Sequence, residues 1–464
     1  MKKIISVFCV FICFTFVIDL SAEAYDMKYG KNFYEKVIKL ECEYIESLVL
    51  PNGAVGYDIP KASGGFDIAT LPAVDGISPA VYTNWAYTRV VPYFSAFAIL
   101  GIMAADYENA REITLNYINW YISSMNTAKS DVNGVAGTVY DYYVFVSPEG
   151  DKAVQVTYMD VLGDKARNYD STDSYASTFL QILSAYTQKY DNTFLDDKKD
   201  LLQTLESVIY STYCKNVSLT GAKPDYMVCY LMDNCEVYAG FRDLSVLFPE
   251  YKEDAEKFKN GIMNALYCDD GYYYPAVFEN GKTAYTIDDK TSFDFYPHGT
   301  SQLFPITFGI LDPASDEAKA QYELFNSVYG QNGKAGRDWT AADCGDAYPW
   351  ALNLRAAVKM NDFRRAENFI HYVYIKYIAT GHSGNYYCGE AGNMLLALTE
   401  LCEKGFNEAD ASLPEGSRPE NSVSEAPSKQ GSFKKYIPYI ALGASVVLGT
   451  AAIIWALNKK KKDK

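Results

Sequence analysis

Twelve segments with helical periodicity, spread between residues 31 and 404, constrain the fold of this chain more than any other feature. In one of them, Phe179, Leu180 and Leu183 follow Ala176 at the i+3, i+4 and i+7 spacing of a single helix face. The twelve segments form six consecutive pairs and cover residues 31–49, 85–105, 107–125, 173–190, 196–213, 233–247, 251–267, 299–311, 316–329, 346–360, 362–379 and 388–404.

Alternate segments differ in character. Every second segment is apolar on nearly all faces, as residues 94–100 and 394–398 show best, whereas the segments between them carry charges on one face. A helix that is apolar all round is buried all round. The pattern therefore predicts an all-α fold, an (α/α)6 toroid of six helical hairpins, in which the inner helices begin around one mouth.

Two β-hairpins are expected as small insertions between the helices. The first runs from 138–146 through a turn at 147–150 to 154–158. The second runs from 271–278 to 283–286 and turns at Asn280-Gly281, which is a strong hairpin signal between alternating residues. The polar stretch 50–83, rich in Gly, Pro and Asp, is interpreted as an excursion outside the core.

The two ends of the chain predict where the helical domain is located. Residues 1–24 have the basic start, apolar run and small-residue ending of a signal peptide that is removed. Residues 434–464 contain the uncharged run Tyr436–Leu457, which is long enough to cross a bilayer, followed by a basic tail expected in the cytoplasm. Residues 406–433 read as a flexible stalk. We therefore expect an extracellular domain, 25–405, on a single-pass cell-membrane anchor.

Charge and cysteine content narrow the possible partners. The chain has a formal net charge of −16, and its C-terminal 31 residues contribute seven Lys and one Asp. The outward-facing part is therefore more acidic, at about −22, which argues against nucleic acid as a partner. Eight cysteines remain after the signal peptide, none in a Cys-x-x-Cys pair, and both free thiols and disulfides are compatible with them. They are Cys42, Cys214, Cys229, Cys235, Cys268, Cys344, Cys388 and Cys402.

The predicted entrances of the inner helices combine aromatic side chains with charged or amide groups. Flat aromatic faces stack on sugar rings, and polar groups bind the hydroxyls, so this combination favours a carbohydrate ligand. The candidate substrate-binding residues are Trp85, Arg89, Asp170, Tyr175, Tyr296, His298, Trp339, Trp350 and Tyr387.

The densest of these entrances is Tyr169–Tyr175, which holds two carboxylates, three hydroxyls and two phenols. Asp173 is a natural helix N-cap there, because its carboxylate can accept the free N–H groups of the first turn. Asp170 would then face the cleft. Capping alone is the simpler interpretation of the stretch.

The twelve-helix layout, with acidic residues at the inner-helix entrances, resembles the six-hairpin glycosidase superfamily over residues 31–404. Residues 171–176 are similar to the Thr-Asp loop that carries the base in family 8 endoglucanases. The Ser-Glu-Gly-type acid segment of those enzymes is not visible, so the resemblance extends to the superfamily and to no single family.

The resemblance implies a pair of carboxyl groups on either side of the scissile glycosidic bond. Asp173 is the candidate base, and Glu236, followed by Glu390, is the candidate acid. Asp233 and Asp346 could exchange roles with these. For each residue the alternative is an N-cap or an ion pair with one of three arginines, Arg89, Arg242 or Arg337.

The sequence thus predicts a surface-anchored glycoside hydrolase that cleaves an extracellular or cell-envelope polysaccharide or oligosaccharide, without a cofactor or metal ion. One alternative is a non-catalytic glycan-binding or exopolysaccharide-assembly protein on the same fold. Another is a sugar epimerase. That chemistry usually relies on cleft histidines, and the chain has three: His298, His371 and His382.

Overall fold

The computed structural model describes residues 28–62, 65–163 and 168–405. The predicted signal peptide, stalk and membrane anchor lie outside these residues. Within the described ranges, no helix is both long and apolar enough to cross a membrane.

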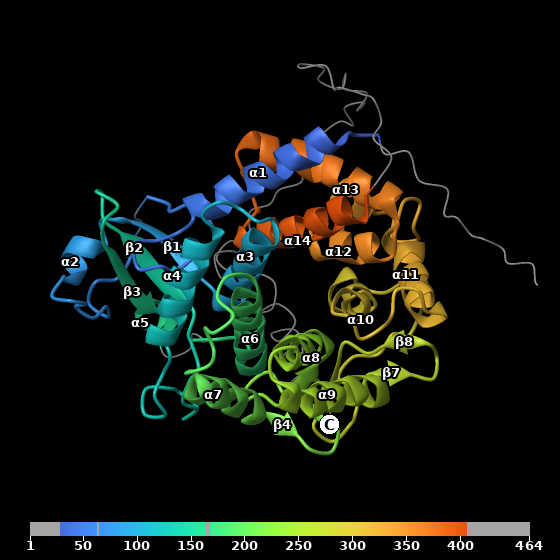
Figure 1. Ribbon diagram of the computed structural model, residues 1–464, viewed down its shortest axis with the longest axis horizontal. Coiled ribbons are helices and arrows are strands. Elements are labelled where there is room, and N and C mark those ends of the chain that lie inside the picture. Colours follow the sequence, from blue (N-terminus) through green and yellow to red (C-terminus); the bar gives the residue numbers. More distant parts are fainter. Residues whose placement is uncertain (1–27, 63–64, 164–167, 406–464) are drawn as a thin grey trace, which may run out of the picture.

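Six inner helices form a closed ring, in which each helix contacts the next and the last contacts the first (Figure 1). In ring order they are α3 (Pro92–Ala104), α6 (Thr172–Lys189), α8 (Leu231–Ser245), α10 (Phe304–Thr307), α12 (Leu352–Lys359) and α14 (Cys388–Lys404). Helices α8 and α14 are three steps apart in either direction, so they lie on opposite sides of the ring.

Six further helices form the outer layer (Figure 1). They are α1 (Lys31–Ser47), α4 (Ala110–Ser123), α7 (Lys199–Tyr210), α9 (Lys252–Ala265), α11 (Asp316–Tyr329) and α13 (Phe363–Lys376). The predicted alternation of inner and outer helices is confirmed, and the helical domain is an (α/α)6 toroid. Short helical turns complete the chain: α2 (Pro79–Tyr82), α5 (Tyr158–Leu162), η1 (Pro249–Tyr251), η2 (Phe295–Gly299), η3 (Trp339–Ala341) and η4 (Ile378–Thr380).

Glycines bring neighbouring inner helices into backbone contact. A Cβ atom on Gly392 of α14 would lie 2.1 Å from the carbonyl oxygen of Phe97 on α3, far inside van der Waals distance. A Cβ atom on Gly240 of α8 would lie 2.7 Å from the carbonyl oxygen of Ser177 on α6. These close approaches hold α14 against α3 and α8 against α6, and helices α6, α8 and α14 carry candidate carboxyl groups.

Three predicted inner helices start later or are shorter than expected. Helix α3 begins at Pro92 instead of 85, since proline suits the first turn, where no N–H donor is needed. Helix α12 begins at Leu352 instead of 346, after Pro349, and the residue before a proline is disfavoured in helical conformation. In place of the helix expected over 299–311, the π-helical turn η2 ends at Gly299 and the short α10, which contains Pro305, follows it.

A three-stranded antiparallel sheet lies beside the toroid and consists of β1 (Ala86–Val90), β2 (Tyr142–Val146) and β3 (Ala153–Thr157). The first predicted hairpin is thus confirmed as β2–β3, but residues 86–90, expected to be helical, form its third strand. Val144 packs into the toroid core, whereas Phe145 packs on the other face, where Leu71 and Tyr82 from the 50–83 excursion cover the sheet.

The second predicted hairpin is confirmed in a shorter form. The turn at Asn280-Gly281 is present, and after it Thr283 pairs with Val277 in a single antiparallel bridge, with the Ala284 N–H bonded to the Ala276 carbonyl at 3.0 Å. In addition, β9 (Ala276–Phe278) pairs with β6 (Val228–Tyr230). Two other short pairs are β4 (Tyr213–Cys214) with β5 (Leu219–Thr220) and β7 (Tyr267–Cys268) with β8 (Tyr272–Tyr273).

Candidate functional site

The start of helix α6 is capped by Ser171 and not by Asp173. The Ser171 Oγ accepts the Ser174 N–H at 3.3 Å, while Asp173 lies in the first turn. The N-cap therefore lies two residues before the predicted position. A serine hydroxyl caps a helix as well as a carboxylate does. Asp173 is completely buried, and its Oδ2 atom has no hydrogen-bond partner among the described residues.

Serine hydroxyls link three buried carboxyl groups at the starts of α6 and α8. The Ser171 Oγ lies 2.5 Å from Asp173 Oδ1 and 3.3 Å from Asp233 Oδ2. One hydroxyl has one proton and cannot donate to both carboxyl groups, so Ser171 donates to Asp173 and accepts from Asp233 when Asp233 is protonated. Ser174 donates to Glu236 Oε2 and so joins the third carboxyl group to the cluster.

Tyr93 connects this carboxyl cluster to a central cavity. Its hydroxyl, on the first turn of α3, donates to Glu236 Oε1 at 2.6 Å. The Tyr93 side chain also lines the cavity, as does Glu390 on the first turn of α14. One oxygen of Glu390, Oε2, accepts the Ala351 N–H at 2.6 Å. Glu236 and Glu390 thus come from opposite helices of the ring.

The central cavity is lined mainly by residues at or near the starts of inner helices. They are Tyr93, Phe94, Phe97, Met232, Tyr296, Phe304, Trp350, Leu352, Tyr387, Glu390 and Asn393. Most are aromatic or apolar, while Glu390 and Asn393 supply polar groups. Its volume is about 40 Å³. Ligand pockets usually measure roughly 300–1,000 Å³. A sugar ring can therefore enter only if side chains at the entrance, such as the half-buried Tyr296 and Trp350, move aside.

Burial raises the pKa values of the carboxyl groups in the site to different extents. Desolvation raises the pKa of Glu236 to about 8, that of Glu390 to about 7 and that of Asp173 to about 6. Burial and the neighbouring Asp173 raise the pKa of Asp233 well above its usual value. At neutral pH, Glu236 is therefore mostly protonated and Asp173 mostly ionised, which is the kind of division that general acid–base chemistry requires.

None of these four carboxyl groups forms an ion pair within the part of the chain that the structure describes. Arg242 pairs instead with Asp243 and Arg337 with Asp343, while the Arg89 guanidinium lies 4.3 Å from the centre of the Tyr57 ring. Ion pairing with these arginines therefore does not account for the four carboxyl groups.

The structure brings together a large part of the predicted site. Tyr296, Trp350 and Tyr387 line the cavity with Glu390, and Asp173, Asp233 and Glu236 form the adjoining cluster. Asp346 is exposed, and its Oδ2 accepts the Trp350 indole N–H at 3.0 Å. Arg89 stands behind Tyr57, whose ring stacks on that of Tyr387.

Three other predicted residues lie away from the cavity. Trp85 packs with the apolar cluster on the outer face of the three-stranded sheet. Trp339 is completely buried in the core, where it donates to the Asn326 side chain at 2.9 Å. His298 stands edge-on to Tyr285 and is not among the cavity-lining residues. Its pKa is lowered by burial.

Asp170 and Tyr175 lie next to the carboxyl cluster. Asp170 is half-buried and raises the pKa of Asp233 and Tyr296. Tyr175 donates to Asp141, a buried carboxyl group whose pKa is raised well above its usual value by desolvation. Asp141 was not predicted, because it lies directly before a strand, whereas the candidate residues were taken from the starts of inner helices.

Sequence reasoning also missed Tyr93 and Asn393. The expected helix start at 85 placed the entrance at Trp85, whereas Pro92 was the signal that would have pointed to Tyr93. Asn393 lies one turn after Glu390 on the same face of α14, where its side chain accepts from Arg355 at 2.9 Å. Among the described residues, no group of three or more potential ligands is arranged to hold a metal ion.

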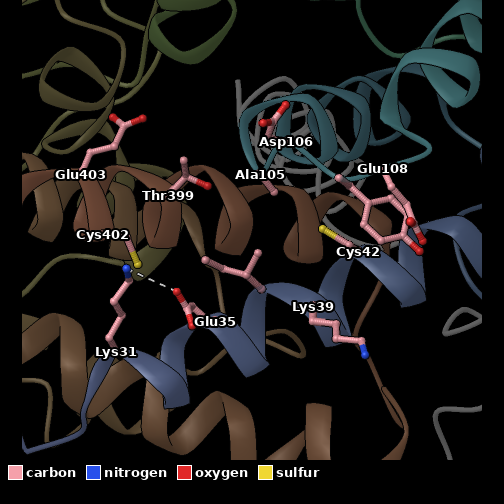
Figure 2. Close-up of a pocket in the computed structure, with 12 residues that line it drawn as sticks. Lys31, Glu35, Lys39, Cys42, Ala105, Asp106, Glu108, Thr399, Cys402 and Glu403 are labelled. Carbon is pink, nitrogen blue, oxygen red and sulfur yellow. Dashed lines mark ion pairs between the residues drawn. The ribbon is translucent and has the colours of Figure 1, made fainter.

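A second pocket, of about 550 Å³, lies between α1 and the C-terminal ends of α3 and α14 (Figure 2). Figure 2 shows Lys31 and Glu35, which form an ion pair at 3.5 Å, beside Cys42, Thr399 and Cys402. It is separated from the central cavity by the length of α14, since Glu390 is in the first turn of that helix and Cys402 in the last.

Solved structures share this architecture. A glycosidase variant in complex with glucose aligns with a TM-score of 0.50 and 10% identity over 80% of this chain and 97% of its own. A D-mannose isomerase aligns with a TM-score of 0.50 and 11% identity over 81% and 98%. The chain has the six-hairpin toroid fold. The expected resemblance to the six-hairpin glycosidases is confirmed at this level. No protein-family model matches the sequence, and no curated protein matches it either.

Proposed function

We propose that this protein is a glycoside hydrolase in which Glu236 and Glu390 act on a glycosidic bond from opposite sides of the central cavity. The observation that carries the proposal is the placement of two buried carboxyl groups, with different pKa values, on opposite helices: Glu390 lines the aromatic cavity, and Glu236 accepts a hydrogen bond from the cavity-lining Tyr93. Buried carboxyl groups without ion pairs are costly, and such groups are concentrated at functional sites.

Glu236 is the proposed general acid. Its pKa of about 8 keeps it protonated at neutral pH, so it can donate a proton to the leaving oxygen. Glu390 reaches the cavity and, once ionised, activates a water molecule or attacks the sugar directly.

Asp173 takes a different role in this proposal from the base expected from the sequence. It is completely buried and, unlike Glu236, is not hydrogen-bonded to the cavity-lining Tyr93, but its charge raises the pKa of Glu236. We therefore assign Asp173 to keeping the acid protonated.

The proposed substrate is an extracellular or cell-envelope glycan, and the predicted signal peptide, stalk and anchor belong to the same proposal. Helix α14 begins at the cavity and ends at Lys404, where the predicted stalk would leave. Its 17 residues correspond to about 25 Å at ~1.5 Å per residue. The stalk would therefore join the domain at the end opposite to the cavity.

The test is the release of reducing ends from a panel of polysaccharides and oligosaccharides. We expect the wild type and a Glu400→Gln control to hydrolyse at least one of them, because Glu400 pairs with Lys359 and lies near the end of α14. The Glu236→Gln/Glu390→Gln double variant should be inactive. Glycan binding by the wild type without release from any substrate would favour the binding-protein alternative.

A sugar isomerase is the second candidate, favoured by the similarity of the fold to that of a D-mannose isomerase. Its product would be an isomerised monosaccharide without new reducing ends. Chromatography of monosaccharides incubated with the wild type separates the two activities. The cavity-lining residues include no histidine, which favours the hydrolase.

A further inference from the structure

Two buried cysteines lie in contact beside the carboxyl cluster. Cys214 ends β4 and Cys229 lies in β6, and their sulfur atoms are 3.4 Å apart. Both thiols are free in this structure, with Cys229 completely buried and Cys214 nearly so. A disulfide bond is about 2.05 Å long, so the two sulfur atoms need to approach by little more than an ångström to form one.

The chain between these cysteines supports the starts of both helices that carry the cluster. The Ala222 carbonyl accepts the N–H of Thr172, which directly precedes Asp173, at 2.7 Å. The side chain of Asn234, next to Asp233 on α8, bonds the N–H and carbonyl of Thr220 at 2.8 and 2.9 Å. A movement of residues 215–228 would therefore be transmitted to Asp173 and Asp233.

We propose that Cys214 and Cys229 are joined by a disulfide when the protein matures in an oxidising compartment, and that this bond fixes the segment supporting Asp173 and Asp233. The inference goes beyond the proposed hydrolase activity and does not depend on that activity, but it rests on the proposed export of the domain. A closed loop of this length restricts the unfolded chain and stabilises the native state.

The bond forms by thiol–disulfide exchange with a small or protein disulfide, R–S–S–R. The Cys214 thiolate attacks one sulfur of the reagent and expels the first R–S⁻. Cys229 then loses its proton and attacks the Cys214 sulfur, which expels the second R–S⁻. Two protein thiols are oxidised, and the reagent leaves as two R–SH molecules.

Cys214 is suited to be the attacking group. The Cys229 thiol donates a hydrogen bond to its sulfur, and this bond lowers the pKa of Cys214. The thiolate is the reactive form in exchange. Because both sulfurs are buried in the folded domain, the exchange occurs during folding, when Cys214 and Cys229 are already in contact but the segment does not yet pack against α6 and α8.

Peptide mapping after alkylation tests the bond directly. The full-length protein is exported into an oxidising cell compartment, denatured in iodoacetamide without reductant, and digested. We expect a linked peptide pair containing Cys214 and Cys229, which separates on reduction, in the wild type and in a Cys235→Ser control. In Cys214→Ser, Cys229 should carry the alkyl group. Alkylation of both cysteines in the wild type would overturn the proposal.

The stabilising effect has its own measurement. Reduction of the wild type should lower its melting temperature by about 4 °C, as a loop of this length and a domain of this size imply. The Cys214→Ser/Cys229→Ser double variant should melt at the same temperature with and without reductant. An unchanged wild-type melting temperature would show that the bond does not fix this segment.

Discussion

At the scale of single residues, the site consists of carboxyl groups whose protonation is set by burial and by each other. The sequence predicted Asp173, Asp233, Glu236 and Glu390 from their positions at helix starts, and the structure brings all four to the same end of the ring. Trp339 was misplaced, because an aromatic residue beside acidic ones looks alike in sequence whether it faces a cavity or the core. Burial, which separates the two cases, depends on tertiary packing.

The pH dependence of activity should report the charge of Asp173. In Asp173→Asn, the negative neighbour of Glu236 is removed, so the pKa of Glu236 should fall. The alkaline limb of the profile of kcat/KM against pH should move to lower pH, while activity persists below it. Complete loss of activity at every pH would instead show that Asp173 is the base itself.

Stability should also depend on Glu236. A carboxyl group whose pKa is raised in the folded state contributes stability that is fully present below its unfolded pKa and is lost as pH rises through the folded value. With a folded pKa of about 8, wild-type stability should fall between mildly acidic pH and pH 8.

In Glu236→Gln, which does not ionise, that part of the decrease should disappear. Between acidic and alkaline pH, the difference in unfolding free energy between the two proteins should shift in favour of the variant by roughly 3–5 kcal/mol. Urea unfolding at acidic and alkaline pH measures the difference. Equal pH dependence in both proteins would show that Glu236 is ionised in the native state.

At the scale of elements, the sequence predicted which helices are inner and outer but not where every helix begins. Hydrophobic periodicity identifies a buried face, but it does not separate a helix from a strand that is buried on both sides. Residues 86–90 form such a strand, and their side chains alternate between the toroid core and the apolar cluster on the other face of the sheet. Prolines set the true starts of α3 and, through Pro349, of α12. The pairing of β9 with β6 joins segments far apart in the chain, so local turn chemistry could not reveal it.

The contact between α3 and α14 should tolerate no side chain at Gly392. In Gly392→Ala, the new methyl group would overlap the Phe97 carbonyl, and the helices would have to separate. We expect a loss of about 2–3 kcal/mol in the free energy of unfolding, measured by urea titration. Glu403→Ala, at an exposed position of the same helix, should change it by no more than about 0.5 kcal/mol. Equal stability of both variants would contradict the close packing.

At the scale of the whole molecule, the toroid separates two ends with different properties. The central cavity is at the starts of the inner helices, whereas the larger pocket and Lys404 are at the opposite end of α14. The fold was predictable because six repeated pairs leave few other ways to bury six apolar helices. The volume of the cavity could not be predicted from the sequence, since it depends on how the aromatic side chains pack against each other.

Removal of residues 434–464 should release the protein from the membrane, because this segment holds the long uncharged run. The full-length chain should sediment with membranes in alkaline carbonate, and the truncated chain should remain in the supernatant with its activity intact. A full-length chain that carbonate extracts would contradict the proposed anchor.

The central claim is that Glu236 and Glu390 are the acid and the catalytic carboxylate. Its most direct test is the pH profile of kcat/KM for the wild type, Glu236→Gln and Glu390→Gln on one hydrolysed glycan. For the wild type we predict a bell-shaped profile, with an acidic limb near the pKa of about 7 for Glu390 and an alkaline limb near the pKa of about 8 for Glu236. Each variant should lose about 10²–10⁴-fold in activity and the limb that belongs to the missing group. Activity within a few-fold of the wild type, with both limbs retained in either variant, would contradict the account.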